Sequence, residues 1–425
     1  MIFKNIRLID SLNDRDMVTD LEISDGKIIS IDKTDKPGID MTGKIMAPGF
    51  IDAHVHFRDP GQTEKEDIET GSIAAARGGF TSVICMANTR PTMDSKELIE
   101  DFVKRAENLK INVYTVSALT KGFKGIDIVD MEEHLKAGAV AFTDDGIPDM
   151  RTDIVKLAME KAKELDAVIS FHEEDPSLIK ENGINHGKVS EKLNVYGSPR
   201  AAEDVMVARD GALSLYTGAK VVIQHISSGV SVDLVRFYKS LGANLYAEVT
   251  PHHFTLTEDA VLEHGTRAKM NPPLRTSCDR EKILKAIADG TIDMIATDHA
   301  PHTKEEKDRE LIKAPSGITG LETSFSLANM HLLKKGLIDL KKLVELMSVN
   351  AAKLYNLPGG EIKVGEVSDF VIFDTSTKWK FEESLSKSKN TPFLNEEMEG
   401  KIWMTFAKGN IAYIDKDLKI NKNLI

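Results

Sequence analysis

Short apolar runs and longer amphipathic stretches alternate through the middle of the chain. The runs consist of β-branched or apolar residues, as buried strands do, and stretches such as 152–165 and 201–216 carry apolar residues three or four positions apart, as helices do. Strands that alternate with helices indicate βα units and a parallel sheet. The predicted strands are residues 49–57, 81–86, 112–118, 139–142, 168–171, 220–226, 244–249 and 293–296. Eight such units predict an α/β fold of the (β/α)₈, TIM-like barrel type.

The two ends of the chain show a different pattern. Strand-like residues 21–24 and 27–30 flank Asp25-Gly26, which is a two-residue hairpin signal. Strand patterns return near the other end, at residues 369–373, 401–406 and 411–413. We expect both ends to pair into one small β-sandwich domain, residues 1–45 and 358–425, beside a barrel domain of residues 46–357.

Composition and charge argue against a protein that binds nucleic acid or membranes. Hydrophobic residues make up 41% of the 425, enough for a large core, and the net charge of −12 argues against a nucleic-acid or anionic-membrane surface. The two cysteines, Cys85 and Cys278, are consistent with a reducing compartment. The first residues carry no signal-peptide pattern, and no apolar run approaches the ~18 residues of a membrane span. We therefore expect a cytoplasmic protein that binds neither nucleic acid nor membrane.

Histidines stand at the predicted strand ends. His54 and His56 are two residues apart at the end of the first barrel strand, so both imidazoles lie on one side of it. His172 and His225 stand at or near the ends of two other strands. The active site of such barrels lies at the C-terminal ends of the strands. Any one of these histidines could be structural, but the group indicates a metal site.

Acidic residues recur at the same level, with Asp144 and Asp145 after the fourth strand and Asp298 after the eighth. A buried carboxylate normally binds a metal, pairs with a base or shifts its pKa. Four imidazoles and two carboxylates are too many for one four-coordinate zinc with an open position, but they suffice for two metals joined by a bridging anion. No lysine lies between Lys136 and Lys156, so Asp144 or Asp145 must provide the bridge.

Seven segments carry a close resemblance that runs almost from end to end of the chain. They are GFIDAHVHFRDPG (49–61), NTRP (88–91), FTDDG (142–146), TPHH (250–253), NPPLR (271–275), DHAPH (298–302) and GITGLET (317–323). The chain resembles the metal-dependent amidohydrolases and, within them, the bacterial-type (type I) dihydroorotases. The His-x-His segment is shared with allantoinases, whereas Thr-Asp-Asp-Gly replaces a lysine segment of hydantoinases and allantoinases and therefore points to dihydroorotase.

The resemblance implies a role for each matching residue. His54 and His56 would bind one Zn²⁺ and His172 and His225 a second, giving two per subunit. The family's bridging aspartate precedes the strand-five histidine by 27 positions, which selects Asp145. Asp298 would complete the first zinc's ligands and act as the catalytic proton shuttle. The implied substrate-binding residues are His56, Arg58, Asn88, Asn271, His302, Ser316 and Gly317.

The implied reaction is the reversible, zinc-dependent cyclisation of N-carbamoyl-L-aspartate to (S)-dihydroorotate and water, in pyrimidine (UMP) biosynthesis. The metals would activate a water near neutral pH, and Asp298 would move its proton to the ring nitrogen. The Arg58 fork suits the carboxylate of this small-molecule substrate. The resemblance also implies a homodimer and leaves open an association with aspartate transcarbamoylase.

Two positions depart from the family pattern, and one segment looks like a lid. Glu173 stands where cysteine is frequent, which puts local contacts in question, and Ser316 stands where a bulky aromatic residue is common. Residues 303–315 are rich in lysine, glutamate and aspartate. We expect this loop to close over the bound substrate.

Alternatives stay open. The fold alone also permits an allantoinase or a dihydropyrimidinase-like cyclic amidohydrolase. A non-catalytic dihydroorotase-like scaffold subunit is a third reading, although such proteins lose metal ligands. Arg58 could instead pair with Asp59 or Glu64, while Asn88 and Asn271 stand near prolines and could simply form turns.

Overall fold

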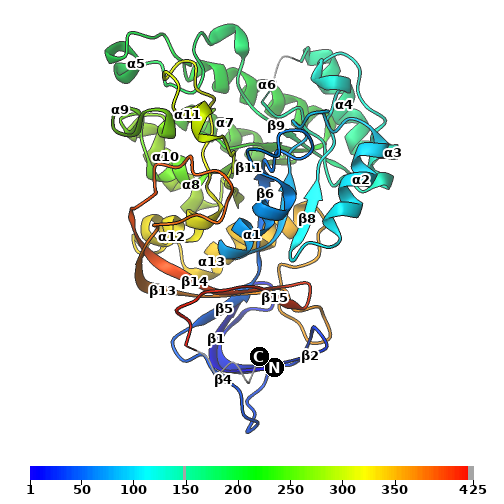
Figure 1. Ribbon diagram of the computed structural model, residues 1–425. Helices are drawn as coiled ribbons and strands as arrows, with labels where there is room; N and C mark the ends of the chain where they lie inside the picture. The colour runs from blue at the N-terminus through cyan, green and yellow to red at the C-terminus, as the bar shows by residue number, and fades with distance from the viewer. Residues whose placement is uncertain (147–149, 420–425) are drawn as a thin grey trace.

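Parallel strands surround the centre of the larger part of the molecule, and helices lie outside them (Figure 1). The computed structural model describes residues 1–146 and 150–419. One parallel sheet contains β6 (Phe50–Val55), β7 (Phe80–Cys85) and β8 (Asn112–Thr115). A second contains β9 (Val168–Phe171), β10 (Lys220–Ile223), β11 (Leu245–Val249) and β12 (Met294–Ile295).

Two seams close these sheets into a ring. Phe142 forms parallel bridges to Ser117 on one side and to Ile169 on the other. Val55, at the end of β6, pairs in parallel with His299, which follows β12. The predicted (β/α)₈ barrel is therefore confirmed, and its closure brings the C-terminal ends of all the strands to one face.

The fourth predicted strand, residues 139–142, is shorter than expected. Its residues still fill the gap between β8 and β9, because the Val140 amide donates to Thr115 O at 3.0 Å and the Phe142 amide donates to Val168 O at 3.1 Å. Within the segment only Phe142 forms bridges to its neighbours, and helix α3 (Met131–Ala137), with Gly138 (φ 111°) at its C-cap, comes directly before it. Few residues are then left before the loop that carries Asp144 and Asp145.

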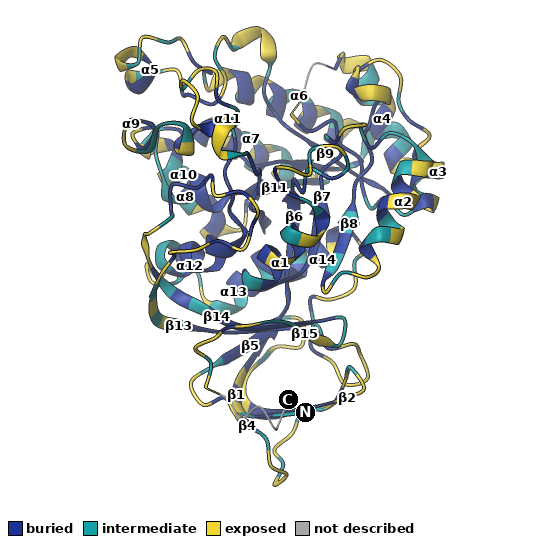
Figure 2. Cartoon of the chain, in the orientation of Figure 1, coloured by how far each residue is buried: buried dark blue, intermediate teal, exposed yellow. Residues whose placement is uncertain are grey.

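The helices bury one face against the barrel and expose the other (Figure 2). The predicted helices 152–165 and 201–216 are present as α4 (Thr152–Glu164) and α6 (Ala201–Thr217). The other α-helices are α1 (Ile68–Arg77), α2 (Lys96–Ala106), α5 (Lys188–Lys192), α7 (Gly229–Ser240), α8 (Pro251–Thr255), α9 (Ala260–His264), α10 (Ser277–Asp289), α11 (Lys304–Lys307), α12 (Ser324–Ala328), α13 (Leu340–Val344) and α14 (Asn350–Leu354).

Both ends of the chain join one eight-stranded sheet beneath the barrel in Figure 1. Its order is β15-β14-β13-β5-β1-β2-β3, with β4 beside β1. The strands are β1 (Ile2–Asp10), β2 (Arg15–Ser24), β3 (Lys27–Ser30), β4 (Ile39–Asp40), β5 (Ile45–Pro48), β13 (Phe370–Lys380), β14 (Glu397–Ala407) and β15 (Asn410–Ile414). The predicted hairpin is present, with φ of 49° at Asp25 and 73° at Gly26, as a type I′ turn requires.

The sheet curls so that its two halves enclose a small core. Phe3 packs edge-on against Phe370 and Phe406, with ring centroids 5.8 and 6.4 Å apart. Residues from opposite ends of the chain therefore share one apolar interior, and the predicted β-sandwich is confirmed. The division of the chain at residues 46 and 357 stays our proposal.

The Asp374 carboxylate joins three parts of this terminal sheet. Its Oδ2 accepts hydrogen bonds from Lys44 Nζ at 2.7 Å and Trp403 Nε1 at 2.8 Å, and its Oδ1 accepts one from the Thr377 amide at 2.7 Å. Burial alone would raise the pKa of Asp374, but these bonds lower it to about 2. The ionised carboxylate therefore stabilises the folded sheet.

We expect Asp374→Asn to lower the free energy of unfolding by about 1–2 kcal/mol near pH 7. The folded-state pKa lies below the ordinary value of 3.8, so this stabilisation is present above roughly pH 4 and is lost as the pH falls towards 2. Urea unfolding of both proteins at about pH 7, 5 and 3.5 measures the difference. A difference that grows on acidification would contradict the assignment.

Candidate metal centre

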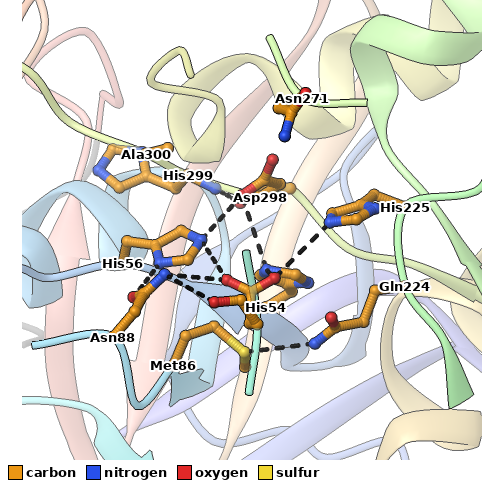
Figure 3. Close-up of polar contacts among 12 residues, drawn as sticks. His54, His56, Met86, Asn88, Gln224, His225, Asn271, Asp298, His299 and Ala300 are labelled. Carbon is orange, nitrogen blue, oxygen red and sulfur yellow. Dashed lines mark hydrogen bonds and ion pairs between the residues drawn. The ribbon is translucent and has the colours of Figure 1, made fainter. Parts of the chain in front are cut away.

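Six buried side chains meet at the C-terminal face of the barrel. They are His54 and His56 at the end of β6, Asp145 after the short fourth strand, His172 after β9, His225 after β10 and Asp298 after β12. The structure thus brings together all six residues that the sequence predicts as metal ligands. Figure 3 shows His54, His56, His225 and Asp298 turned towards a common centre.

The Asp145 carboxylate lies in the middle of the four imidazoles. Its Oδ1 is 3.7 Å from His54 Nε2, 3.7 Å from His172 Nδ1 and 3.8 Å from His225 Nε2. Its Oδ2 is 3.5 Å from His56 Nε2. Each oxygen therefore faces a different part of the cluster, which is the arrangement that a carboxylate shared between two cations requires.

The donor atoms of the cluster fit a divalent metal. The ligand atoms of His54, His56 and Asp298 lie within 4.8 Å of one another, and so do those of His54, Asp145 and His225. The His54 Nε2 atom, common to both groups, is buried and has no hydrogen-bond partner among the described residues. Imidazole nitrogen and carboxylate oxygen are donors that zinc prefers.

The electrostatics of the cluster favour a bound cation. Burial would lower the pKa of His54, but the nearby charge of Asp145 holds it well above its ordinary value. Burial would raise the pKa of Asp145 and of Asp298, but the surrounding histidines hold both well below their usual range. The negative charge of these two buried carboxylates stabilises protonated imidazoles beside them. The same charge would stabilise a metal cation bound between the carboxylates and neutral imidazoles.

Glu248 and Glu174 orient two of the imidazoles, and neither role was predicted from the sequence. Glu248 Oε2 lies 3.2 Å from His54 Nδ1, so Nδ1 carries the hydrogen and Nε2 faces the cluster. Glu174 Oε2 lies 3.1 Å from His172 Nε2, which leaves His172 Nδ1 facing Asp145. The sequence did contain a signal for Glu248, which lies within the apolar run of β11. A charged residue buried in a strand needs a partner, and here the partner is His54.

Asp144, the alternative to Asp145, points away from the cluster. Its Oδ1 accepts hydrogen bonds from the amides of Leu119 at 2.7 Å and Thr120 at 3.0 Å, and its Oδ2 accepts one from the Thr120 hydroxyl. Burial raises the pKa of Asp144 to about 6. Asp144 therefore holds the loop after β8, and Asp145 is the residue that reaches the imidazoles.

A cavity of about 300 Å³ lies beside the cluster. Asn182, which the sequence analysis did not single out, is part of its lining. All seven predicted substrate-binding residues also line it: His56, Arg58, Asn88, Asn271, His302, Ser316 and Gly317.

Arg58 faces this cavity and not the surface. Its Nε donates to Pro301 O at 3.2 Å, and its Nη2 lies 3.4 Å from His302 Nε2. Asp59, the residue with which Arg58 could have paired, forms an ion pair with Arg105 at 2.8 Å instead. The guanidinium therefore contributes positive charge to the cavity.

The two asparagines contact candidate metal ligands directly. Asn88 Oδ1 accepts from His56 Nδ1 at 2.8 Å (Figure 3), and Asn88 Nδ2 donates to Asp145 Oδ2 at 3.0 Å. Asn271 Nδ2 lies 3.4 Å from His172 Nε2. Both side chains thus do more than form the turns that their neighbouring prolines suggested.

Glu173 and Ser316, the two residues that depart from the family pattern, have buried side-chain oxygens without a hydrogen-bond partner among the described residues. Glu173 is buried beside Asp210, and burial together with that neighbouring charge raises the pKa of Glu173 well above its usual range. Ser316 lines the cavity, and its carbonyl accepts a hydrogen bond from His302 Nε2 at 2.8 Å.

Residues 303–315, the expected lid, contain helix α11, capped by Thr303 and Glu306. Closure of this segment over a substrate stays a prediction.

The chain is similar to known proteins along almost its whole length. Residues 45–412 match the model of the amidohydrolase family. The chain is 54% identical over 418 residues to a dihydroorotase of Clostridioides difficile, covering 97% of this chain and 99% of the relative. It is 50% identical over 423 residues to a dihydroorotase of Clostridium acetobutylicum, covering 98% and 100%.

Solved structures share the fold at lower identity. The L-hydantoinase (dihydropyrimidinase) of Arthrobacter aurescens superposes with a TM-score of 0.86 at 24% identity, covering 100% of this chain and 98% of the other. The D-hydantoinase (dihydropyrimidinase) of a Thermus species has a TM-score of 0.85 at 25% identity, covering 99% and 97%. Separately, no helix among the described residues combines the length and the apolar character that crossing a membrane requires.

Proposed function

Because the chain belongs to the amidohydrolase family, we propose that it is a dihydroorotase, which interconverts N-carbamoyl-L-aspartate and (S)-dihydroorotate. The observation that carries the proposal is the Asp145 carboxylate, which lies within 3.8 Å of all four imidazoles. In the resemblance on which this assignment rests, an aspartate at this place distinguishes dihydroorotases from hydantoinases and allantoinases. The full-length similarity to curated dihydroorotases supports the same reaction.

We further propose that the cluster holds two zinc ions. His54, His56 and Asp298 would hold one, His172 and His225 the other, and Asp145 would contact both. When bound, such a pair lowers the pKa of a water molecule towards neutrality and polarises the carbonyl under attack. Asn88, Glu174 and Glu248 keep the imidazoles of His56, His172 and His54 in the required orientation.

Asp298 is the residue that we assign to proton transfer. It is buried, ionised and in contact with both the metal cluster and the cavity. In the hydrolytic direction its carboxylate accepts the proton of the attacking water and returns it to the departing ring nitrogen. In the direction of ring closure the same carboxylate takes the proton from the attacking nitrogen.

Arg58 gives the cavity a positive charge that an anionic substrate can bind, although the protein as a whole is negative. The substrate is an anion and the chain carries a net charge of −12, so the carboxylate needs a cationic partner within the site. Arg58 supplies a planar fork that suits a carboxylate. Burial, together with the charge of Arg58, lowers the pKa of His302 to about 2, so its imidazole is neutral. Asn271 and the backbone at Ser316 and Gly317 surround the remaining space.

The deciding experiment is the hydrolysis rate of (S)-dihydroorotate by zinc-loaded protein, with allantoin and dihydrouracil as parallel substrates. We expect turnover of dihydroorotate and no comparable turnover of the other two. Turnover of dihydrouracil or allantoin in its place would reassign the protein to a sibling cyclic amidohydrolase. Zinc-loaded protein that hydrolyses none of the three would overturn the proposal. A homodimer, a transcarbamoylase partner and a cytoplasmic location stay predictions.

A further inference from the structure

Residues 384–391, which we call the strap, leave the terminal sheet between β13 and β14 and run along the barrel (Figure 1, orange-red). Alternate residues are buried: Ser384, Ser386, Ser388 and Asn390 face inwards, and Leu385, Lys387 and Lys389 are exposed. This alternation is that of an extended chain with one face against the protein. In the sequence the strap is only a mildly polar stretch.

Three serines fasten the strap to the barrel. The Ser384 hydroxyl donates to the Glu322 carboxylate, and the Ser386 hydroxyl donates to the Glu66 carboxylate. The Ser388 hydroxyl donates to the Lys65 carbonyl at 2.7 Å. The backbone that carries Asn390 is therefore held in place over several successive residues.

Asn390 joins two loops that line the cavity. Its Nδ2 donates to Ala300 O at 3.0 Å and to Gly317 O at 3.1 Å, and its Oδ1 accepts from the His302 amide at 3.1 Å. Its own carbonyl accepts from the Thr319 amide at 3.1 Å. The residue is 4% exposed, so these bonds are shielded from water.

The two loops are in close contact where Asn390 joins them, and the Ala300 amide also donates directly to Ile318 O at 2.8 Å. A Cβ atom on Gly317, whose φ is 121°, would lie 2.7 Å from Ala300 Cβ. The Gly317 carbonyl also accepts a hydrogen bond from the buried Lys307 Nζ at 3.0 Å. Loss of the Asn390 donors would leave the Ala300 carbonyl without this bond and weaken the hold on Gly317.

We propose that Asn390 is a positioning residue for the substrate ring, acting through the cavity-lining residues His302, Ser316 and Gly317. The inference rests on the proposed function, because it concerns how dihydroorotate and N-carbamoyl-L-aspartate are held. Asn390 itself belongs to the connection within the terminal sheet, so that sheet supplies part of the geometry of the active site. Its effect is on substrate affinity, since its contacts lie on the substrate side of the cavity and not on the metal ligands.

The test compares Asn390→Ala with Ser388→Ala, which removes another buried, hydrogen-bonded side chain two residues earlier on the strap. In Asn390→Ala we expect the KM for (S)-dihydroorotate to rise roughly tenfold or more, with kcat within about threefold and metal content unchanged. In Ser388→Ala the contacts of Ser384 and Ser386 and all the hydrogen bonds of Asn390 are kept, so we expect KM within about twofold of wild type. Asn390→Ser serves as the milder variant if Asn390→Ala does not fold.

Hydrogen exchange measured by mass spectrometry gives a readout that does not depend on activity. Asn390→Ala should speed exchange in peptides covering residues 300–303 and 317–320, and Ser388→Ala should not. The inference is overturned if both variants raise KM equally, if KM is unchanged, or if metal and kcat fall together at constant KM. Inactive wild-type protein would defeat the proposed function, and the exchange pattern would then still decide whether Asn390 holds the loops at residues 300–303 and 317–320.

Discussion

Replacing Asp298 with asparagine should lower the kcat for (S)-dihydroorotate by at least about a thousandfold. The reason is that an amide cannot accept and return the proton that the carboxylate handles. The residue adopts a left-handed φ of 48°, which asparagine tolerates as readily as aspartate, so the backbone should not change. Steady-state kinetics of the zinc-loaded variant measure the loss, and calorimetric titration with dihydroorotate should show that most binding is retained.

Asp308→Asn is the matched control for this experiment, because it makes the same chemical change at an exposed residue on the loop that follows Asp298. We expect its kcat to stay within about twofold of wild type. Retention of near-normal turnover by Asp298→Asn would remove the residue from proton transfer. Loss of all bound metal in that variant would instead make ligation its principal contribution.

Replacing Asp145 with alanine should remove at least half of the bound metal and reduce turnover by roughly a thousandfold or more. The substitution deletes the carboxylate that lies within 3.8 Å of all four imidazoles. Without it, four imidazoles would face one another around cations that have lost the anion between them. Metal per subunit after dialysis, measured by mass spectrometry, and kcat on dihydroorotate test the prediction together.

Asp144→Ala is the neighbouring control and should behave in the opposite way. Its carboxylate accepts hydrogen bonds from the Leu119 and Thr120 amides and does not face the imidazoles. We expect the free energy of unfolding to fall by about 2–3 kcal/mol because two buried amides lose their acceptor, while metal content stays near wild type. Equal metal loss in the two variants would mean that the loop, and not the Asp145 carboxylate, decides metal binding.

Local patterns in the sequence predicted most of the architecture. The strand at 168–171, the helix predicted at 152–165 and found at 152–164, and the Asp25-Gly26 hairpin each depend on residues adjacent in the chain. Their period and turn chemistry can therefore be read without a structure. The strand ends were predicted less well, because the predicted strands 112–118 and 220–226 end at Thr115 and Ile223, and within 139–142 only Phe142 forms bridges. These strand ends depend on pairing with partners far away in the chain.

The candidate ligands could also be predicted, because each follows a strand whose end the barrel directs to the same face. The residues that support them could not. Glu248 orients His54 from 194 positions away, and Asn390 reaches His302 across 88 positions. Such contacts form only when the barrel closes and the strap lies along it. The sequence by itself therefore determined the helices, the strands and the types of residue that could bind metal. Only the tertiary structure decided that Asp145 faces the imidazoles while Asp144 faces away, and which residues support the ligands. The reason is that tertiary packing alone sets the distances between segments remote in sequence.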